Sequence, residues 1–546
     1  VEAPRPAVGG GRRAASEGQD MISQLQDYLT RSAERDPDHL ALVMGDDRLS
    51  YGELEALTNR LARLLQEHGC VAGSRVCVVA AKTPWTIAGL LAVLKAGGMY
   101  VPIDSTSPAP RVARIFEAAE PSLVLADPTA TGLLDDMIEE GGLPPGVPIG
   151  VVDDSAGGAR FDPAFTRADA VKLSAEPLGR SGDASDTAHI LFTSGSTGGA
   201  KGAVSTHRSV TTGVYAYATG LMVLLGIMES EGRPPANPPR TLVNVPLFHV
   251  TGEVPVLLNS FVIGRGMVLM AKWDPAEAFR LIEKEKITYF VGVPTMSLEL
   301  MTHLDRDKHD LSSLTDIAAG GAPRPISHVE RLQKTFESAQ PALGYGLTET
   351  NAVGCSNFWS NYADKPGSTG RAQKPFVEIA ILGDGDGHLP SGERGEIGIK
   401  SAANFKGYWR DPEATRAAFT DDGYVRTGDI GYLDEDGYLF IVDRKKDIII
   451  RGGENISAAE VEAACYGHPQ VAEVSVFGAP DERLGEVPIA VVHGRDGLDE
   501  AALREFLEGR VAAFKVPARF IFSDEPLPRL GTGKIDRVAL KDRFAR

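Results

Sequence analysis

Short apolar segments alternate with helical patterns through the first part of the chain, and this alternation restricts the fold more than any other feature. Leucines at helical spacing predict a helix over residues 52–69, and an apolar run predicts a buried strand over 76–80. A second helix over 87–95 and a second strand at MYVPID, residues 99–104, follow directly. Strands separated by helices form parallel sheets with helices on both faces, so we expect a doubly wound α/β domain.

The alternation returns at residues 287–293 and 316–319, and the pattern changes after about residue 375. Short strands and Asp-Gly and Ser-Gly turns beyond that point predict antiparallel structure or a small β-barrel-like part. Residues 447–546 contain apolar strands and a helix that begins at Ser457, with Glu460 three positions later as a capping box. We therefore expect a separate, small α+β domain at the C-terminus.

Composition excludes several classes of partner. The 546-residue chain has a net charge of −18, which argues against nucleic acid and anionic membrane surfaces. No apolar run reaches the roughly 18 residues of a membrane helix; the best candidate is 220–228. Four scattered cysteines without a C-x-x-C pair indicate a reducing cytosol. Residues 1–20 lack the apolar centre of a signal peptide, and we expect them to be a disordered leader.

The segment LFTSGSTGGAKGAVSTH, residues 191–207, has the composition of a phosphate-binding loop. Its small and hydroxylic side chains let backbone N–H groups approach an anion closely. The P-loop pattern G-x-x-x-x-G-K-[ST] is broken, because Ala200 stands at the second glycine and Gly202 at the magnesium-binding hydroxyl. A P-loop NTPase is therefore excluded, and the magnesium ligand of any triphosphate bound here must lie elsewhere in the chain.

Three further segments accompany this loop: LGYGLTETNA (343–352), DGYVRTGDIGYLDEDGYLFIVDRKKD (422–447) and LPRLGTGKIDR (527–537). In this order and at these separations, the four segments resemble the adenylate-forming superfamily of acyl-CoA synthetases, aryl-CoA ligases, luciferases and peptide-synthetase adenylation domains. The resemblance extends over about residues 21–540. It implies that a carboxylate attacks the α-phosphate of Mg-ATP to give an acyl-adenylate and pyrophosphate. A thiol, usually that of coenzyme A, then displaces AMP to give a thioester.

The resemblance also assigns roles to residues. Lys534 would bridge the substrate carboxylate and the α-phosphate, Thr348 would touch the α-phosphate, and Glu349 would be the magnesium ligand. Tyr345 would stack on adenine, and Asp429 would accept hydrogen bonds from both ribose hydroxyls. The other ATP- or AMP-binding residues implied are Thr193, Ser194, Gly195, Ser196, Thr197, Gly198, Lys201, Gly321, Ala322, Pro323, Gly344, Gly346, Ile441 and Arg444. The family usually has proline where this chain has Ala200, a change that frees φ and removes no phosphate ligand.

The segment NVPLFHVTG, residues 244–252, resembles the part of acyl- and aryl-CoA ligases that carries a catalytic histidine, here His249. Amino-acid-activating domains usually have an aspartate in this region; it is absent here, although Glu253 is close, so an α-amino acid is disfavoured. The residues of the implied acyl pocket are small or apolar, and they suit a fatty acid, which we favour, or an aromatic acid. Its residues would be His249, Val291, Gly292, Pro294, Thr295, Gly320, Gly321, Gly344 and Ala352.

The segment RGGENIS, residues 451–457, resembles the loop that meets coenzyme A in the second half-reaction. The expected contacts are Arg451, Gly452, Gly453 and Glu454. Lys446 stands where the family has its hinge. The implied organisation is a leader (1–20), a large adenylate-forming domain (21–443), a hinge (444–446) and a mobile C-terminal lid (447–546).

Two alternatives remain: a different acceptor for the acyl group, and a nucleotide-binding protein without catalytic activity. An amine, a carrier-protein thiol or oxygen could replace coenzyme A. A nucleotide-binding protein that has lost its chemistry would lack Lys534, Glu349 or the loop hydroxyls, and all of these are present. Acyl chain length and oligomeric state stay open.

Overall fold

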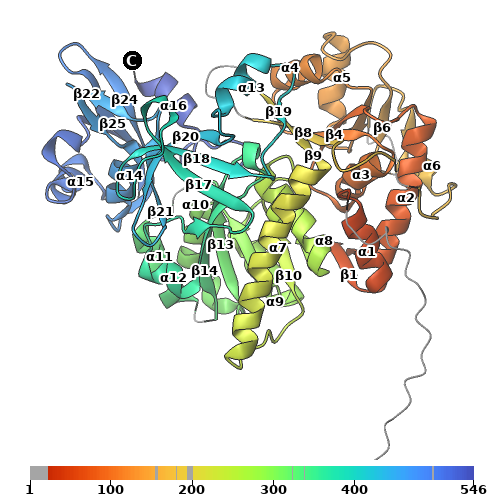
Figure 1. Cartoon of the computed structure of the whole chain (residues 1–546), viewed down its shortest axis with the longest axis horizontal. Helices are drawn as coiled ribbons and strands as arrows, with labels where there is room; N and C mark the ends of the chain where they lie inside the picture. Colours follow the sequence, from red (N-terminus) through yellow and green to blue (C-terminus); the bar gives the residue numbers. More distant parts are fainter. Residues whose placement is uncertain are drawn as a thin grey trace, which may run out of the picture.

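The computed structural model describes residues 23–153, 158–179, 181–193, 201–322, 324–336, 338–494 and 497–545. Figure 1 shows a large body of sheets and helices with a smaller unit at the upper left, built from the last part of the chain. We refer to residues 23–443 as the large domain and to 447–545 as the lid. The sequence prediction of a large α/β domain followed by a small α+β domain is confirmed.

One sheet of the large domain has nine strands within the described residues. From β1 to β14 its neighbours are parallel apart from the antiparallel edge strand β2, and β15 and β16 add an antiparallel edge on the other side. The carboxyl ends of β10, β12, β13 and β14 therefore meet at one edge, where such sheets bind ligands. In sheet order the strands are β16 (Arg371–Ala372), β15 (Gly354–Phe358), β14 (Gln340–Gly346), β13 (Asp316–Gly320), β12 (Tyr289–Gly292), β10 (Arg240–Val243), β11 (Gly266–Leu269), β1 (Leu40–Met44) and β2 (Asp47–Ser50).

A second sheet has eight strands within the described residues and is parallel from β8 through β7. Strand β9 pairs antiparallel with β8, so the phosphate-loop segment between them is the connection of a hairpin. In sheet order the strands are β19 (Gly407–Tyr408), β9 (Gly202–Thr206), β8 (Thr187–Phe192), β4 (Met99–Asp104), β3 (Arg75–Ala80), β5 (Leu123–Ala126), β6 (Ile149–Val151) and β7 (Phe165–Thr166).

The antiparallel part predicted after residue 375 is a four-stranded sheet within the described residues, and every neighbouring pair in it is antiparallel. Its strands are β17 (Val377–Leu382), β18 (Gly395–Ser401), β20 (Val425–Leu433) and β21 (Leu439–Arg444). The lid has its own sheet of β23 (Glu454–Ile456), β22 (Ile449–Arg451), β25 (Gly485–Gly494), β24 (Val471–Asp481) and β26 (Arg519–Ser523).

The predicted local elements agree with the structure to within a few residues at their ends. The predicted helices become α2 (Tyr51–Glu67) and α3 (Pro84–Lys95), and α3 is buried along almost its whole length, which explains its lack of a polar face. The other helices are α1 (Asp27–Arg35), α4 (Ala109–Ala119), α5 (Thr131–Glu139), α6 (Arg167–Ala170), α7 (His207–Ser230), α8 (Asn259–Ile263), α9 (Pro275–Glu285), α10 (Pro294–Thr302), α11 (Ile326–Thr335), α12 (Trp359–Asp364), α13 (Pro412–Ala418), α14 (Ala458–Tyr466), α15 (Glu500–Leu507) and α16 (Arg537–Phe544).

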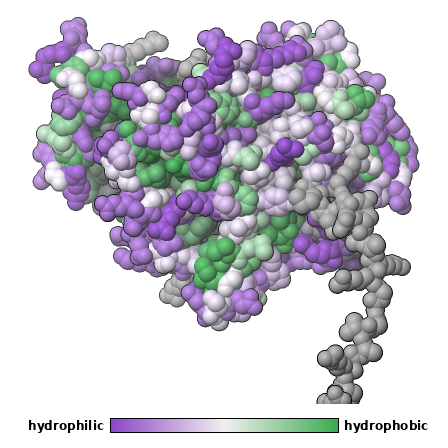
Figure 2. Space-filling view, viewed as in Figure 1, coloured by the Kyte–Doolittle hydropathy of each residue, from purple (hydrophilic) through white to green (hydrophobic). Residues whose placement is uncertain are grey.

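Two local predictions need correction. The hydroxyl of Ser457 caps α14 by accepting from the Glu460 N–H at 3.0 Å, but the Glu460 carboxylate accepts from Lys515 at 2.6 Å. Helix α7 is long and apolar enough to cross a membrane by length and composition, whereas the sequence analysis found no such run. Its first half is buried, as expected of a core helix, and its second half exposes Met222 and Val223. Figure 2 shows an apolar area at the bottom of the molecule, where the lower end of α7 lies in Figure 1.

Candidate active site

Lys534 reaches from the lid into the large domain. It lies on a tight loop in which the Leu530 N–H donates to the Lys534 carbonyl and the Gly533 N–H donates to the Leu530 carbonyl, both at 2.8 Å. A Cβ added to Gly321, directly after β13, would lie 2.9 Å from the Lys534 Cε and 3.1 Å from its Nζ. Burial, together with the nearby charge of Arg444, lowers the pKa of Lys534 to about 8. The ammonium therefore stands at the ligand-binding edge of the nine-stranded sheet.

Asp429 is a second polar centre of the site, only 3% exposed. Strand register sets Asp429 on β20 opposite Arg444 on β21, and the Arg444 Nε lies 3.1 Å from a carboxylate oxygen. The other oxygen accepts from the Tyr345 hydroxyl at 2.7 Å. Burial raises the pKa of Asp429, and both partners oppose that shift. The sequence analysis assigned Tyr345 to adenine stacking; the structure adds this hydroxyl contact with the expected ribose-binding carboxylate.

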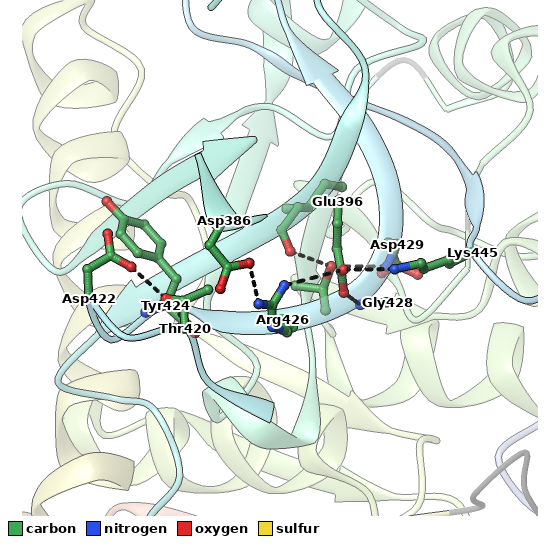
Figure 3. Close-up of polar contacts among 11 residues, drawn as sticks. Asp386, Glu396, Thr420, Asp422, Tyr424, Arg426, Gly428, Asp429 and Lys445 are labelled. Atoms are coloured by element: carbon green, nitrogen blue, oxygen red, sulfur yellow. Dashed lines mark hydrogen bonds and ion pairs between the residues drawn. The ribbon is translucent and has the colours of Figure 1, made fainter. Parts of the chain in front are cut away.

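Glu396 contacts the backbone of β20 directly before Asp429. Its carboxylate accepts from the Gly428 N–H at 3.1 Å and lies 3.4 Å from the Lys445 ammonium, as Figure 3 shows. The Lys445 N–H in turn donates to the Gly428 carbonyl at 2.9 Å. One carboxylate on β18 thus links the part of β20 that carries Asp429 to the first residues of the hinge.

Glu349 lies in a short 3-10 helix (Thr348–Thr350) directly after β14. One of its carboxylate oxygens accepts from the Tyr408 hydroxyl at 2.7 Å, and the Lys201 Nζ lies 5.1 Å from the centre of the Tyr408 ring. Pairing of Tyr408 on β19 with Ala203 on β9 brings this ring beside the end of the phosphate loop. The sequence analysis missed Tyr408; the aromatic residues of the segment FKGYW were the available signal.

The donor set suits magnesium brought in by ATP. Glu349 offers a hard carboxylate oxygen, and magnesium in nucleotide sites takes one or two carboxylates together with phosphate oxygens and water. In the part of the chain that the structure describes, no group of three or more His, Cys, Asp or Glu could hold a metal by itself. The residues therefore fit a metal that arrives with the nucleotide better than a permanently bound one.

The phosphate loop is described only at its ends. The Thr193 N–H donates to the Lys201 carbonyl at 2.9 Å, which closes the hairpin. The loop residues Ser194, Gly195, Ser196, Thr197 and Gly198, and also Pro323 beyond β13, lie outside the described residues.

An apolar cavity of about 70 Å³ opens beside Gly321. Of the residues assigned to the acyl pocket from the sequence, Val291, Gly320, Gly321, Gly344 and Ala352 line it. His249, Gly292, Pro294 and Thr295 are not among its lining residues. The sequence analysis missed several others, drawn from α7, β12, β15, and the π-helix Gly252–Leu258 with the residue before it: Tyr217, Thr251, Pro255, Tyr289, Ser356 and Phe358.

His249 lies beside the cavity rather than in it. Its Nδ1 accepts from the Thr251 N–H at 3.2 Å, which leaves this nitrogen unprotonated. Burial and the neighbouring Lys534 charge lower the pKa of His249 to about 3, so the ring is neutral at physiological pH.

Of the remaining predicted residues, Gly346 ends β14, where a Cβ would lie 2.3 Å from the Ala352 carbonyl oxygen. Ala322 follows Gly321, and Ile441 is half-buried on β21.

The expected coenzyme A loop does not join these groups. Arg451, Gly452, Gly453 and Glu454 form the turn between β22 and β23, at the outer side of the lid in Figure 1. The Gly452 N–H donates to the Leu484 carbonyl at 2.7 Å and the Arg451 guanidinium to the Phe514 carbonyl at 3.0 Å, and both acceptors belong to the lid. With Lys534 inside the site and this turn outside it, the arrangement suits the first half-reaction.

The residues expected to bind a nucleotide lie on three sheets, and a separate lid brings a lysine to them. This arrangement suits an enzyme that joins ATP to a second substrate. The AMP-binding enzyme family matches residues 29–409, and the AMP-binding enzyme C-terminal domain matches residues 460–534. The chain therefore belongs to the AMP-binding enzyme family and is an AMP-forming acid–thiol ligase that uses a carboxylic acid, ATP and coenzyme A.

Relatives of known activity differ in the acid they use. The chain is 33% identical to a feruloyl-CoA synthase of Amycolatopsis sp, over 95% of the chain and 99% of that protein. It is also 33% identical to the long-chain-fatty-acid–CoA ligase FadD13 of Mycobacterium tuberculosis, over 92% of the chain and 94% of that protein. Among solved structures, ATP-bound MatB from Rhodopseudomonas palustris superposes with a TM-score of 0.80 at 28% identity, covering 95% of the chain and 99% of that structure.

Proposed function

We propose that this enzyme activates a compact aromatic carboxylic acid with a polar ring substituent and transfers it to coenzyme A. The observation that carries the proposal is the size and lining of the cavity beside Gly321, about 70 Å³. A single water needs on the order of 10–15 Å³ by the same measure, so the space accepts a few water volumes, roughly one ring. A long alkyl chain needs a longer channel than this.

The polar groups of the cavity favour the same substrate. Ser356 on β15 pairs with Gly344, and its hydroxyl is buried without a hydrogen-bond partner among the described residues. The rings of Tyr217 and Tyr289 also face the cavity, and the Tyr217 hydroxyl donates to the Ala352 carbonyl at 2.6 Å. A buried hydroxyl without a partner is costly, and a ring hydroxyl or methoxy group of the substrate would satisfy it. A fatty acid offers no such group.

The roles of the chain's own residues follow from their positions. Lys534 offsets the repulsion between the substrate carboxylate and the α-phosphate as they approach. Asp429 and Tyr345 hold the nucleoside, and Thr193 and Lys201 hold the phosphates at the two ends of the loop. Glu349 would hold Mg²⁺, which neutralises phosphate charge when bound. For the second half-reaction we propose that the lid turns about Lys446, withdraws Lys534 and brings in Arg451–Glu454 with the thiol.

The fatty acid favoured by the sequence remains the second candidate, because a relative of equal identity is named a long-chain-fatty-acid–CoA ligase. The test is thioester formation with ATP, Mg²⁺ and coenzyme A from three acids: a hydroxylated or methoxylated cinnamic acid, unsubstituted cinnamic acid and hexadecanoic acid. We expect the highest kcat/KM for the substituted cinnamic acid. In Ser356→Ala the preference over unsubstituted cinnamic acid should fall about tenfold, the usual effect of one lost hydrogen bond. A preference for hexadecanoic acid would overturn the proposal.

A further inference from the structure

Arg529 joins the lid to the large domain beside Lys534. One terminal nitrogen of its guanidinium donates to the Gly533 carbonyl and to the Thr295 hydroxyl, both at 2.8 Å. The other nitrogen forms an ion pair with Glu473 on β24 of the lid and lies 3.6 Å from Glu299. Thr295 and Glu299 belong to α10 of the large domain, so one side chain contacts the lysine loop, the lid sheet and the opposite domain.

The lid side of this arrangement makes the lysine loop rigid. The carboxylate of Glu473, 7% exposed, accepts from the Leu527 N–H at 2.6 Å in addition to pairing with Arg529. The Arg529 guanidinium then fixes Gly533, which has a φ of +80° and directly precedes Lys534. Because these partners all belong to the lid, these contacts persist wherever the lid moves.

The large-domain side provides a matching pair of acceptors. Thr295 and Glu299 are one helical turn apart on α10, so their side chains share a face. The indole N–H of Trp273 also donates to Glu299, which holds that carboxylate in place. A planar guanidinium binds such a pair of acceptors with defined geometry. These two contacts exist only while Lys534 is in the site, since any withdrawal of the lid separates Arg529 from α10.

We propose that Arg529 is a positioning residue that seats Lys534 for adenylation through Thr295 and Glu299 and releases it for thioester formation. The inference rests on the two-state lid proposed above. Its physical basis is that a misplacement of about 1 Å of a reacting group costs on the order of 100-fold in rate. The side chain is 25% exposed, so we assign it a role in geometry rather than a large contribution to stability.

The test measures the two half-reactions separately in Arg529→Ala and in the double variant Thr295→Val/Glu299→Gln. Adenylation is followed by pyrophosphate release, and the second half by thioester formation from pre-made acyl-adenylate. We expect adenylation to fall about 10- to 100-fold in Arg529→Ala and less in the double variant. The second half should stay within about threefold of wild type, since these contacts are absent in that state.

Arg504 provides a matched control. It is another lid arginine, but its ion pair with Glu500 at 2.8 Å lies within one helix of the lid. Arg504→Ala should keep both half-reactions. Equal losses in both halves of Arg529→Ala, or wild-type adenylation in the double variant, would overturn the proposal.

Hydrogen exchange gives a readout that does not depend on the identity of the acid. In the substrate-free enzyme, Arg529→Ala should reduce protection of the Gly533 amide, whereas Arg504→Ala should not. Unchanged protection of the Gly533 amide would contradict the proposed role of Arg529. A wrong choice of acid class would instead appear in the wild-type substrate screen, so the two failures can be told apart.

Discussion

Lys534 of the lid lies so close to Gly321 of the large domain that a methyl group on Gly321 would come within 2.9 Å of the lysine Cε. Gly321 also has a φ of +77°, which side chains other than glycine rarely adopt. The absence of a side chain at this position is therefore what lets the ammonium reach the edge of the sheet.

Gly321→Ala should displace Lys534 and lower adenylation by roughly 10- to 100-fold while sparing thioester formation from acyl-adenylate. The measurement is the rate of each half-reaction. Gly437 is a suitable control, because it has a φ of +78° and no atom within 4 Å of an added Cβ. Gly437→Ala meets the same backbone strain without touching the lysine and should keep adenylation. If both variants lose adenylation equally, strain rather than the displaced lysine is the cause.

Removing the Lys534 side chain should lower the rate of adenylation more than displacing it does. Lys534→Ala should lower adenylation by about 100-fold or more, the usual cost of one charged transition-state contact. Thioester formation from pre-made acyl-adenylate should continue, because the proposed lid rotation withdraws Lys534 in that half-reaction. A stopped-flow comparison of both halves decides the matter, and a similar loss in each would assign Lys534 a structural role.

The pH profile should report the same ammonium. Its pKa is lowered to about 8 by burial, and adenylation needs the protonated form. The kcat/KM for ATP should therefore have its full value below pH 7, where Lys534 is protonated, and should fall as pH rises through about 8. His249, with its pKa lowered to about 3, stays neutral over this pH range and should not add a second change to the pH profile. In Lys534→Arg the fall near pH 8 should disappear, because guanidinium stays charged; its persistence would point to another group.

Much of this site could be predicted from the sequence because its residues belong to contiguous motifs. Lys534, Glu349 and Asp429 each stand in a short segment whose glycines and polar residues identify it, and the doubly wound fold follows from local alternation of strands and helices. Both kinds of signal require only neighbours along the chain.

The residues that were missed act across long separations in sequence. Tyr408 meets Glu349 from 59 residues away, and Arg529 meets Thr295 across 234 residues. Neither pairing has a local signature, because each depends on which strands and domains become adjacent. The same holds for Ser356, whose place in the cavity depends on the antiparallel pairing of β15 with β14.

We expect Tyr408 to affect magnesium binding through its hydrogen bond to Glu349. Glu349→Gln should keep the fold and lose most turnover, because a neutral amide is a poor magnesium ligand. Tyr408→Phe removes the 2.7 Å hydrogen bond and should raise the magnesium concentration needed for half-maximal rate by several-fold, with kcat at saturating magnesium largely kept. Titration of pyrophosphate release with Mg²⁺ measures both variants. Full activity in Glu349→Gln would remove that residue from the metal site.

Lys446 is the residue on which the proposed lid rotation depends. It is exposed, in a turn that the Asp447 N–H closes by donating to the Arg444 carbonyl at 2.9 Å. The Ser457 hydroxyl of the lid donates to the Val442 carbonyl of the large domain at 2.8 Å, so this hydrogen bond spans the short link between the two domains. Rotations of this kind are absorbed by φ and ψ changes at a few such residues.

Proline at position 446 would hold φ near −65° while leaving the Asp447 hydrogen bond available. We expect Lys446→Pro to retain acid-dependent pyrophosphate release, because the structure already has Lys534 seated, and to lose most thioester synthesis, because the lid can no longer turn. Lys446→Ala should retain both, since it removes the side chain and leaves φ free. Single-turnover rates of each half-reaction in the two variants provide the measurement. Thioester formation at the wild-type rate in the proline variant would show that the lid turns elsewhere.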